Sequence, residues 1–110
     1  MEAGQVVYRL VASEVVTDSD FASWREKRPN REYDDECKAC GLSVSSTVEG
    51  AQAIRRTNPG LRNYRVAEGI LTRDHGVILP TASACCADHL TWWPLDAIDR
   101  KEPFRVIEEP

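Results

Sequence analysis

The sequence predicts an α+β domain in which a mixed or mostly antiparallel sheet carries two helices. Three observations favour this class. Short apolar stretches alternate with a period of two, two other segments show helical spacing, and the chain has 110 residues, a common size for one domain. We therefore expect residues 1–110 to fold as a single domain around one hydrophobic core.

The first predicted elements are a strand over residues 5–12 and a helix between Thr17 and Pro29. Both sides of the strand are largely apolar, so we expect it to be covered on at least one face. Thr17 is followed by acidic and hydroxyl side chains that suit the start of a helix. Phe21 and Trp24 then recur at helical spacing, which gives this helix one apolar face.

A second strand and a second helix follow in the sequence. Residues 37–45 become apolar and favour a strand. Ser46 and Glu49 match a capping box, in which the serine side chain accepts a hydrogen bond from a helical N–H and the glutamate reaches back. Residues 58–60, Asn-Pro-Gly, end this helix.

Three further segments complete the predicted sheet. Residues 64–72 alternate in polarity and form a strand, with Gly69 as the position of a bulge. Residues 77–79 form a short strand, and the turn at 74–76 joins it to the preceding strand as a hairpin. Residues 104–107 form the closing strand.

Composition and charge argue against several classes of protein. The chain has 14 Lys and Arg against 18 Asp and Glu, a formal charge of −4, whereas binding to a phosphate backbone is driven by basic side chains. No apolar run approaches the roughly 18 residues of a membrane helix, and residues 1–4 lack the basic and apolar regions of a secretory signal. We therefore expect a cytoplasmic protein whose partner is a protein or a small molecule, not nucleic acid or a membrane.

The four cysteines suggest a zinc site. Two of them form a C-x-x-C turn, and the other two are adjacent and lie shortly before a histidine. Thiolates and imidazoles are the ligands of closed, tetrahedral structural zinc sites. The predicted ligands are Cys37, Cys40, Cys85 and His89, with Cys86 as the alternative to Cys85 and His75 as a substitute.

Two other interpretations of the cysteines stay open. Reduced thiols in a cytosolic protein can serve as small hydrophobic side chains. A disulfide or a redox role is the third interpretation. A thioredoxin-type motif is disfavoured because its C-x-x-C opens a helix, whereas Cys37 and Cys40 precede a predicted strand.

Arg9 is a charged residue inside an apolar strand. Burying a guanidinium is costly unless it meets a carboxylate or a phosphate. It is therefore either an anion-binding group or an arginine on an edge strand that pairs with Asp or Glu. Ser43 and Ser45 project from one side of the second strand, where they line a site or face solvent.

The segment from His89 to Pro94 has the most unusual composition in the chain. Trp92 and Trp93 are adjacent on a predicted strand and must point to opposite faces, so one can fill the core while the other is at least partly exposed. An exposed Trp beside a His is a stacking platform for a ring, although both can also cover the core. The predicted ligand-binding residues are Arg9, Ser45, His89, Trp92 and Trp93.

Two strings of the sequence resemble a group of small uncharacterised bacterial proteins. They are Cys37-Lys-Ala-Cys-Gly-Leu-Ser-Val44 and His89-Leu-Thr-Trp-Trp93. The group brings no established activity.

The order of elements is also similar to the ADP-ribosyltransferase-like fold. That fold places an Arg or His on its first strand, a Ser-Thr-Ser-like run on a second strand and a Glu on a late strand. The resemblance implies NAD as the cofactor and Arg9, Ser43 and Glu108 as catalytic residues. Val44 stands where the family has Thr and no Glu-x-Glu occurs, which implies a binding or degenerate member rather than an active transferase.

No motif in the sequence requires an enzyme, because it lacks a phosphate-binding glycine loop, G-x-S-x-G and H-E-x-x-H. The leading hypothesis is a small cytosolic binding or regulatory domain of bacterial or phage type. Its surface would combine the loop at 81–89, one of the two tryptophans and Arg9. This requires the Cys37–Cys40 turn, with or without zinc, to lie beside the His–Trp segment. The alternatives are the NAD-dependent enzyme and an acidic inhibitor or antitoxin.

Overall fold

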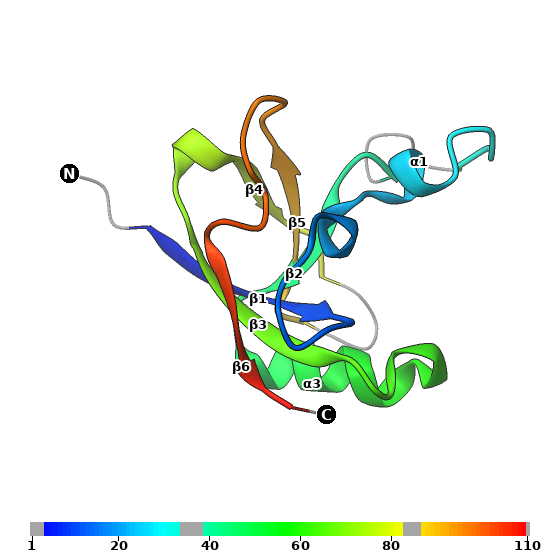
Figure 1. The fold of residues 1–110 in the computed structure, drawn as a ribbon, viewed down its shortest axis with the longest axis vertical. Coiled ribbons are helices and arrows are strands. Elements are labelled where there is room, and N and C mark those ends of the chain that lie inside the picture. Colours follow the sequence, from blue (N-terminus) through cyan, green and yellow to red (C-terminus); the bar gives the residue numbers. More distant parts are fainter. Residues whose placement is uncertain (1–3, 34–38, 83–86, 110) are drawn as a thin grey trace.

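Six strands form one antiparallel sheet in the order β4-β5-β2-β1-β3-β6 (Figure 1). The computed structural model describes residues 4–33, 39–82 and 87–109. The strands are β1 (Gln5–Val11), β2 (Leu42–Ser45), β3 (Arg65–Leu71), β4 (Gly76–Pro80), β5 (His89–Pro94) and β6 (Phe104–Glu108). The described helices are α1 (Trp24–Lys27), α3 (Val48–Thr57) and the 3₁₀ turns η1 (Asp18–Phe21), η2 (Pro59–Leu61) and η3 (Arg73–His75). The predicted α+β class is confirmed.

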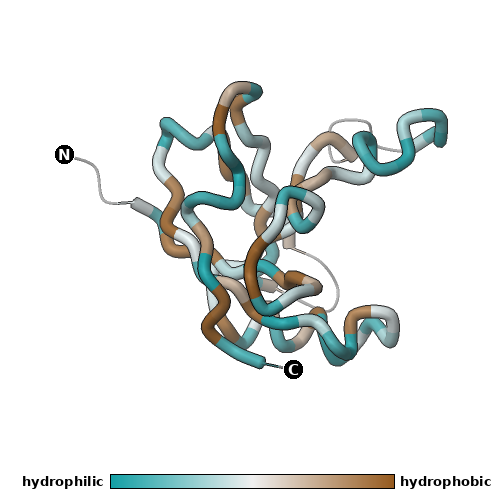
Figure 2. Tube along the Cα trace, viewed as in Figure 1, coloured by the Kyte–Doolittle hydropathy of each residue, from teal (hydrophilic) through white to brown (hydrophobic). Residues whose placement is uncertain are grey.

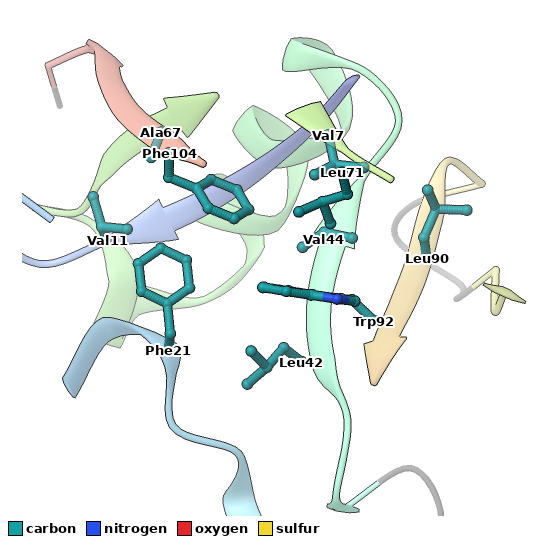
Figure 3. Packing of buried hydrophobic residues seen from close by; sticks show 10 residues of the cluster. All are labelled: Val7, Val11, Phe21, Leu42, Val44, Ala67, Leu71, Leu90, Trp92 and Phe104. Carbon is teal, nitrogen blue, oxygen red and sulfur yellow. The ribbon is translucent and has the colours of Figure 1, made fainter. Parts of the chain in front are cut away.

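One face of the sheet buries the hydrophobic core (Figure 3). Phe21 of η1 closes over this face, and its ring centroid lies 4.8 Å from that of Phe104. Trp92 lies 5.8 Å from Phe104, and its Nε1 donates a hydrogen bond to the carbonyl of His75. The cluster consists of Val7, Val11, Phe21, Leu42, Val44, Ala67, Leu71, Leu90, Trp92 and Phe104.

The helix α3 packs across β1, β2 and β3, and none of its described residues belongs to the core cluster (Figure 1). It therefore covers the other face of the sheet. Ala51 is the hydrophobic residue that α3 buries. Gln52 and Arg55 bind Glu108 of β6, which ties the helix to the edge of the sheet.

The single helix predicted between Thr17 and Pro29 is wrong. The chain forms η1, leaves helical geometry at Ala22 and restarts as α1. The restart has a local cause, because Ser23 Oγ accepts the backbone N–H of Glu26 and the Glu26 carboxylate accepts that of Ser23. In Figure 2 the segment that carries α1 is largely hydrophilic and projects from the sheet.

The helix α3 ends at Thr57 with Asn58 as its C-cap, as predicted, but its N-cap is Thr47 and not Ser46. Thr47 Oγ1 accepts a hydrogen bond from Gly50 N at 2.9 Å. The backbone N–H of Ser46 instead donates to Asp88 O, in the loop that enters β5. A contact from a distant segment therefore moved the start of the helix by one residue.

The predicted hairpin between residues 64–72 and 77–79 is also wrong. The strand β3 pairs with β1 and β6, whereas β4 pairs with β5 at the opposite edge. The turn at Gly76 redirects the chain with φ 129°, and a Cβ there would lie 2.1 Å from the carbonyl oxygen of Trp93. The register shift of β3 lies between Val66 and Ala67 and not at Gly69.

Within the described residues, the helices are too short and too polar to cross a membrane.

Candidate functional site

The sheet opens between β1 and β2. Their register contains one residue pair, Tyr8 with Ser45, whereas β1 and β3 pair along the whole of Gln5–Val11. A cavity of about 660 Å³ lies at this opening, lined by residues of β1, β2, β5, α3 and the segment around α1. Sites for small organic molecules fall in this range of volumes.

The charged side chains that line the cavity are cations. Arg9 and Lys27 are among its described lining residues, and no described Asp or Glu is. The whole chain has more acidic than basic residues, so its composition alone would favour acidic side chains in the lining. The described lining of the cavity therefore carries cationic and no acidic side chains, in a protein that is acidic as a whole.

Arg9 is held at the opening by two backbone carbonyls. Its Nε donates to Asp20 O at 2.9 Å and its Nη1 donates to Ser43 O at 2.7 Å, while its guanidinium carbon lies 5.6 Å from the ring centroid of Phe21. These bonds use two of the five N–H groups of the guanidinium. Burial lowers the pKa of Arg9 to about 10, so the group is still a cation at neutral pH.

The carboxylate of Asp20 is bound to other groups. It accepts hydrogen bonds from Ala12 N, Thr17 N and Thr17 Oγ1 at 3.0, 2.9 and 3.0 Å. Arg9 thus has no ion pair with a carboxylate in the described parts of the chain, and β1 lies inside the sheet. The edge-strand position expected for Arg9 is therefore wrong. The charge of Asp20 still favours the charged form of Arg9 and opposes the effect of burial on its pKa, although the two side chains form no ion pair. The anion-binding interpretation stays a prediction.

The mouth of the cavity carries an exposed aromatic side chain. Trp24 is 55% exposed and lines the cavity, and Lys27 Nζ lies 5.6 Å from its ring centroid. Tyr33 donates its hydroxyl to Trp24 O at 2.7 Å. The sequence analysis did not place Trp24 among the ligand-binding residues. The signal available in the sequence was Ser23, a helix-capping residue that interrupts the apolar face to which Trp24 was assigned.

Glu26 anchors the mouth to the body of the protein. Its carboxylate accepts a hydrogen bond from Arg100 at 2.6 Å, and Arg100 also donates to Phe21 O. The hydrogen bond from Arg100, together with those from Ser23, lowers the pKa of Glu26 to about 2.

A hydroxyl-rich group lines the cavity on the β5 side. His89 Nδ1 lies 2.9 Å from both the carbonyl oxygen and the Oγ1 of Thr81. Thr81 Oγ1 lies 2.7 Å from the Oγ1 of Thr91, whose side chain is buried. All three residues line the cavity.

Most of the predicted ligand-binding residues meet at the cavity. Arg9, Ser45 and His89 line it, as does Ser43. Trp92 does not, because it is fully buried in the core.

The two tryptophans behave as the strand geometry predicts, with Trp92 in the core and Trp93 partly exposed. Trp93 packs beside Gly41, where a Cβ would lie 3.1 Å from its Nε1 and 2.3 Å from Thr91 Cγ2. The end of the dicysteine turn therefore lies against the His–Trp segment, as expected.

The predicted zinc site falls partly outside the described residues, which do not include Cys37, Cys85 and Cys86. Of the other two ligands, Cys40 is exposed and precedes the Leu42 end of β2, whereas His89 pairs with Ser45 at its other end. Leu42 and Ser45 are three residue steps, about 10 Å, apart along β2, so the strand register separates the backbones of Cys40 and His89. Within the described ranges, no group of three His, Cys, Asp or Glu side chains could hold a metal.

The catalytic set implied by the ADP-ribosyltransferase resemblance is only partly assembled. Arg9 and Ser43 are in contact, but Glu108 is not among the described lining residues. Its carboxylate accepts hydrogen bonds from Gln52 and Arg55, which lower the pKa of Glu108.

Comparisons with protein-family models, with curated proteins and with solved structures found no match. The function is therefore inferred from the chemistry of the cavity.

Proposed function

We propose that this protein is a small binding domain that captures an organic anion in the cavity between β1 and β2. The observation that supports this most directly is the environment of Arg9. Its guanidinium is a partly buried cation at the opening, where two backbone carbonyls hold it and no described carboxylate forms an ion pair with it. The expected location of this activity is the cytoplasm.

The cavity chemistry is suited to a carboxylate or a phosphate ester. A guanidinium presents a planar set of donors that matches either anion, and the bonds to Asp20 O and Ser43 O fix its orientation in advance. Partial burial strengthens a charge-assisted hydrogen bond, because less water competes for it. Leu10, Ile54 and the indole of Trp24 supply apolar surface for the rest of the ligand.

The test is titration with benzoate and with phenyl phosphate, followed by calorimetry and tryptophan fluorescence. We expect Arg9→Met to weaken binding by about 10-fold or more, the worth of a hydrogen bond to a charged group. Arg105→Met is the matched control, because Arg105 is 80% exposed on β6 and does not line the cavity. Lys27→Met is a second cavity variant, at the mouth, and should weaken binding less.

Circular dichroism and a thermal melt establish that each variant is folded. The proposal fails if neither anion binds the wild-type protein, or if folded Arg9→Met binds them as the wild type does.

A second candidate is an NAD-dependent activity of the ADP-ribosyltransferase type. It is supported by the hydrogen bond between Arg9 and Ser43 on neighbouring strands, with Ser45 in the same cavity. Nicotinamide release from NAD tests it. Turnover by the wild type that is lost in Arg9→Ala would support the enzyme, whereas binding of NAD without release would support the binding domain. An inhibitor or antitoxin role stays a prediction from the acidic composition.

A further inference from the structure

We infer that the cavity contains a second polar subsite, formed by Thr81, His89 and Thr91, which binds a hydroxyl or amide group of the ligand. This inference rests on the proposed function, because it takes the anionic group of the ligand to lie at Arg9. It also narrows the class of ligand to an elongated organic anion that carries one neutral polar group at a fixed distance from its charged group.

The hydrogen bonds of this subsite leave one hydroxyl hydrogen unused. A carbonyl oxygen can only accept, so the 2.9 Å contact with Thr81 O places a hydrogen on Nδ1 of His89. Thr81 Oγ1 therefore accepts from His89 or makes no bond to it. Thr81 and Thr91 share one hydrogen bond of 2.7 Å, which uses one of their two hydroxyl hydrogens. The other hydrogen is a donor for a ligand, whichever threonine carries it.

His89 adds an acceptor to this donor. An imidazole whose single hydrogen is on Nδ1 has a lone pair on Nε2. No contact with a described residue uses Nε2, and His89 lines the cavity. A group that both accepts and donates satisfies the two sites together, and hydroxyl and amide groups have this property. A second carboxylate would satisfy the donor but oppose the lone pair.

The sheet register sets the distance between the two subsites. Thr91 of β5 pairs with Ser43 of β2, and the carbonyl of Ser43 accepts the hydrogen bond from Arg9 of β1. The Arg9 guanidinium and Thr91 are thus separated by about one strand spacing and one hydrogen bond, roughly 8 Å. Leu10, Ala51 and Ile54 line the same cavity and suit an apolar linker between the polar ends.

The test compares anions with and without a terminal hydroxyl. Octanoate and 8-hydroxyoctanoate span the required distance when extended, and hexyl phosphate and 6-hydroxyhexyl phosphate form the corresponding phosphate pair. Whichever anion type binds, we expect its hydroxylated member to bind about 3- to 10-fold more tightly, the effect of one neutral hydrogen bond. Butanoate and 4-hydroxybutanoate are too short, so their affinities should be equal.

The double variant Thr81→Val with Thr91→Val removes both hydroxyls at nearly constant volume and should reduce the preference for the hydroxylated probe, whereas Thr91→Val alone would free the Thr81 hydroxyl hydrogen and leave a donor in place. Thr57→Val is the matched control, since the Thr57 hydroxyl bonds only carbonyls of α3 and the adjacent Asn58 side chain, and Thr57 itself does not line the cavity. Equal binding of the long probes by the wild type, or an unchanged preference in the folded double variant, overturns the second subsite alone. If no probe binds the wild type, the anion site at Arg9 fails as well.

Discussion

The Nη1 of Arg9 donates a 2.7 Å hydrogen bond to the carbonyl oxygen of Ser43, and so joins β1 to β2 beyond their single register pair. The same guanidinium is anchored on its other side by the carbonyl of Asp20. Two neutral acceptors thus position the cation, while the nearby Asp20 carboxylate favours its charged form without forming an ion pair with it. Such an arrangement favours an anionic ligand more than it favours the stability of the folded chain.

Replacing Arg9 should therefore weaken ligand binding while leaving the stability of the folded protein nearly unchanged. Arg9→Met removes a cation that is costly to bury and keeps most of the apolar volume, so we expect the free energy of unfolding to change by less than about 1 kcal/mol. Urea denaturation measures this change. A loss of several kcal/mol would identify Arg9 as a structural residue and not as one kept for a ligand.

The two adjacent tryptophans should differ sharply in their effect on stability. Trp92 is fully buried between Phe104 and Leu42, and Trp92→Ala should destabilise the protein by roughly 3–5 kcal/mol. Trp93 is only partly buried, so Trp93→Ala should cost about 1 kcal/mol. Denaturant titration of both variants measures the two losses of unfolding free energy. Equal losses would contradict the assignment of Trp92 to the buried face of β5 and of Trp93 to its partly exposed face.

The anchor of the cavity mouth should respond to acid. Arg100 and Ser23 hold the pKa of Glu26 at about 2, below its ordinary value of 4.5, so the ionised carboxylate is favoured in the folded state. This stabilisation is present above about pH 4.5 and is lost as the pH falls toward 2. Glu26→Gln should remove that part of the pH dependence, which denaturation at pH 2–6 will show as a smaller slope than in the wild type.

Gly76 should tolerate no side chain. Its φ of 129° disfavours L-residues, and a Cβ would lie 2.1 Å from the carbonyl oxygen of Trp93. We expect Gly76→Ala to cost about 2 kcal/mol or more, measured as a fall in Tm. Gly60→Ala is the control, since a Cβ there has no neighbour within 4 Å, and its Tm should stay within a few degrees of wild type.

The zinc prediction can be tested on Cys40. Because Cys40 is exposed and lies at the end of the β2–β5 ladder away from His89, we expect it to react with a thiol reagent in the folded protein. Chelator should leave the Tm unchanged. Stoichiometric zinc after purification without chelator, with Cys40 protected from the reagent, would overturn this expectation.

Local patterns were sufficient for the elements whose own side chains determine them. The alternation in residues 64–72 identified β3, and Asn58-Pro59-Gly60 identified the end of α3. Prediction was wrong where a distant segment supplied the partner. The backbone N–H of Ser46 donates a hydrogen bond to the carbonyl of Asp88. The strand β4, which was expected to pair with β3, pairs with β5.

For the candidate site, the sequence by itself determined that Arg9 interrupts an apolar strand and that Trp92 and Trp93 point to opposite faces, because side-chain direction in a strand alternates residue by residue. Only the tertiary structure decided which tryptophan is buried, since the register of Leu42 against Trp92 selects the core face. It also decided that Asp20 offers Arg9 its carbonyl while its carboxylate binds the backbone of Ala12. Such pairings depend on the positions of segments far apart in the chain, which no local pattern encodes.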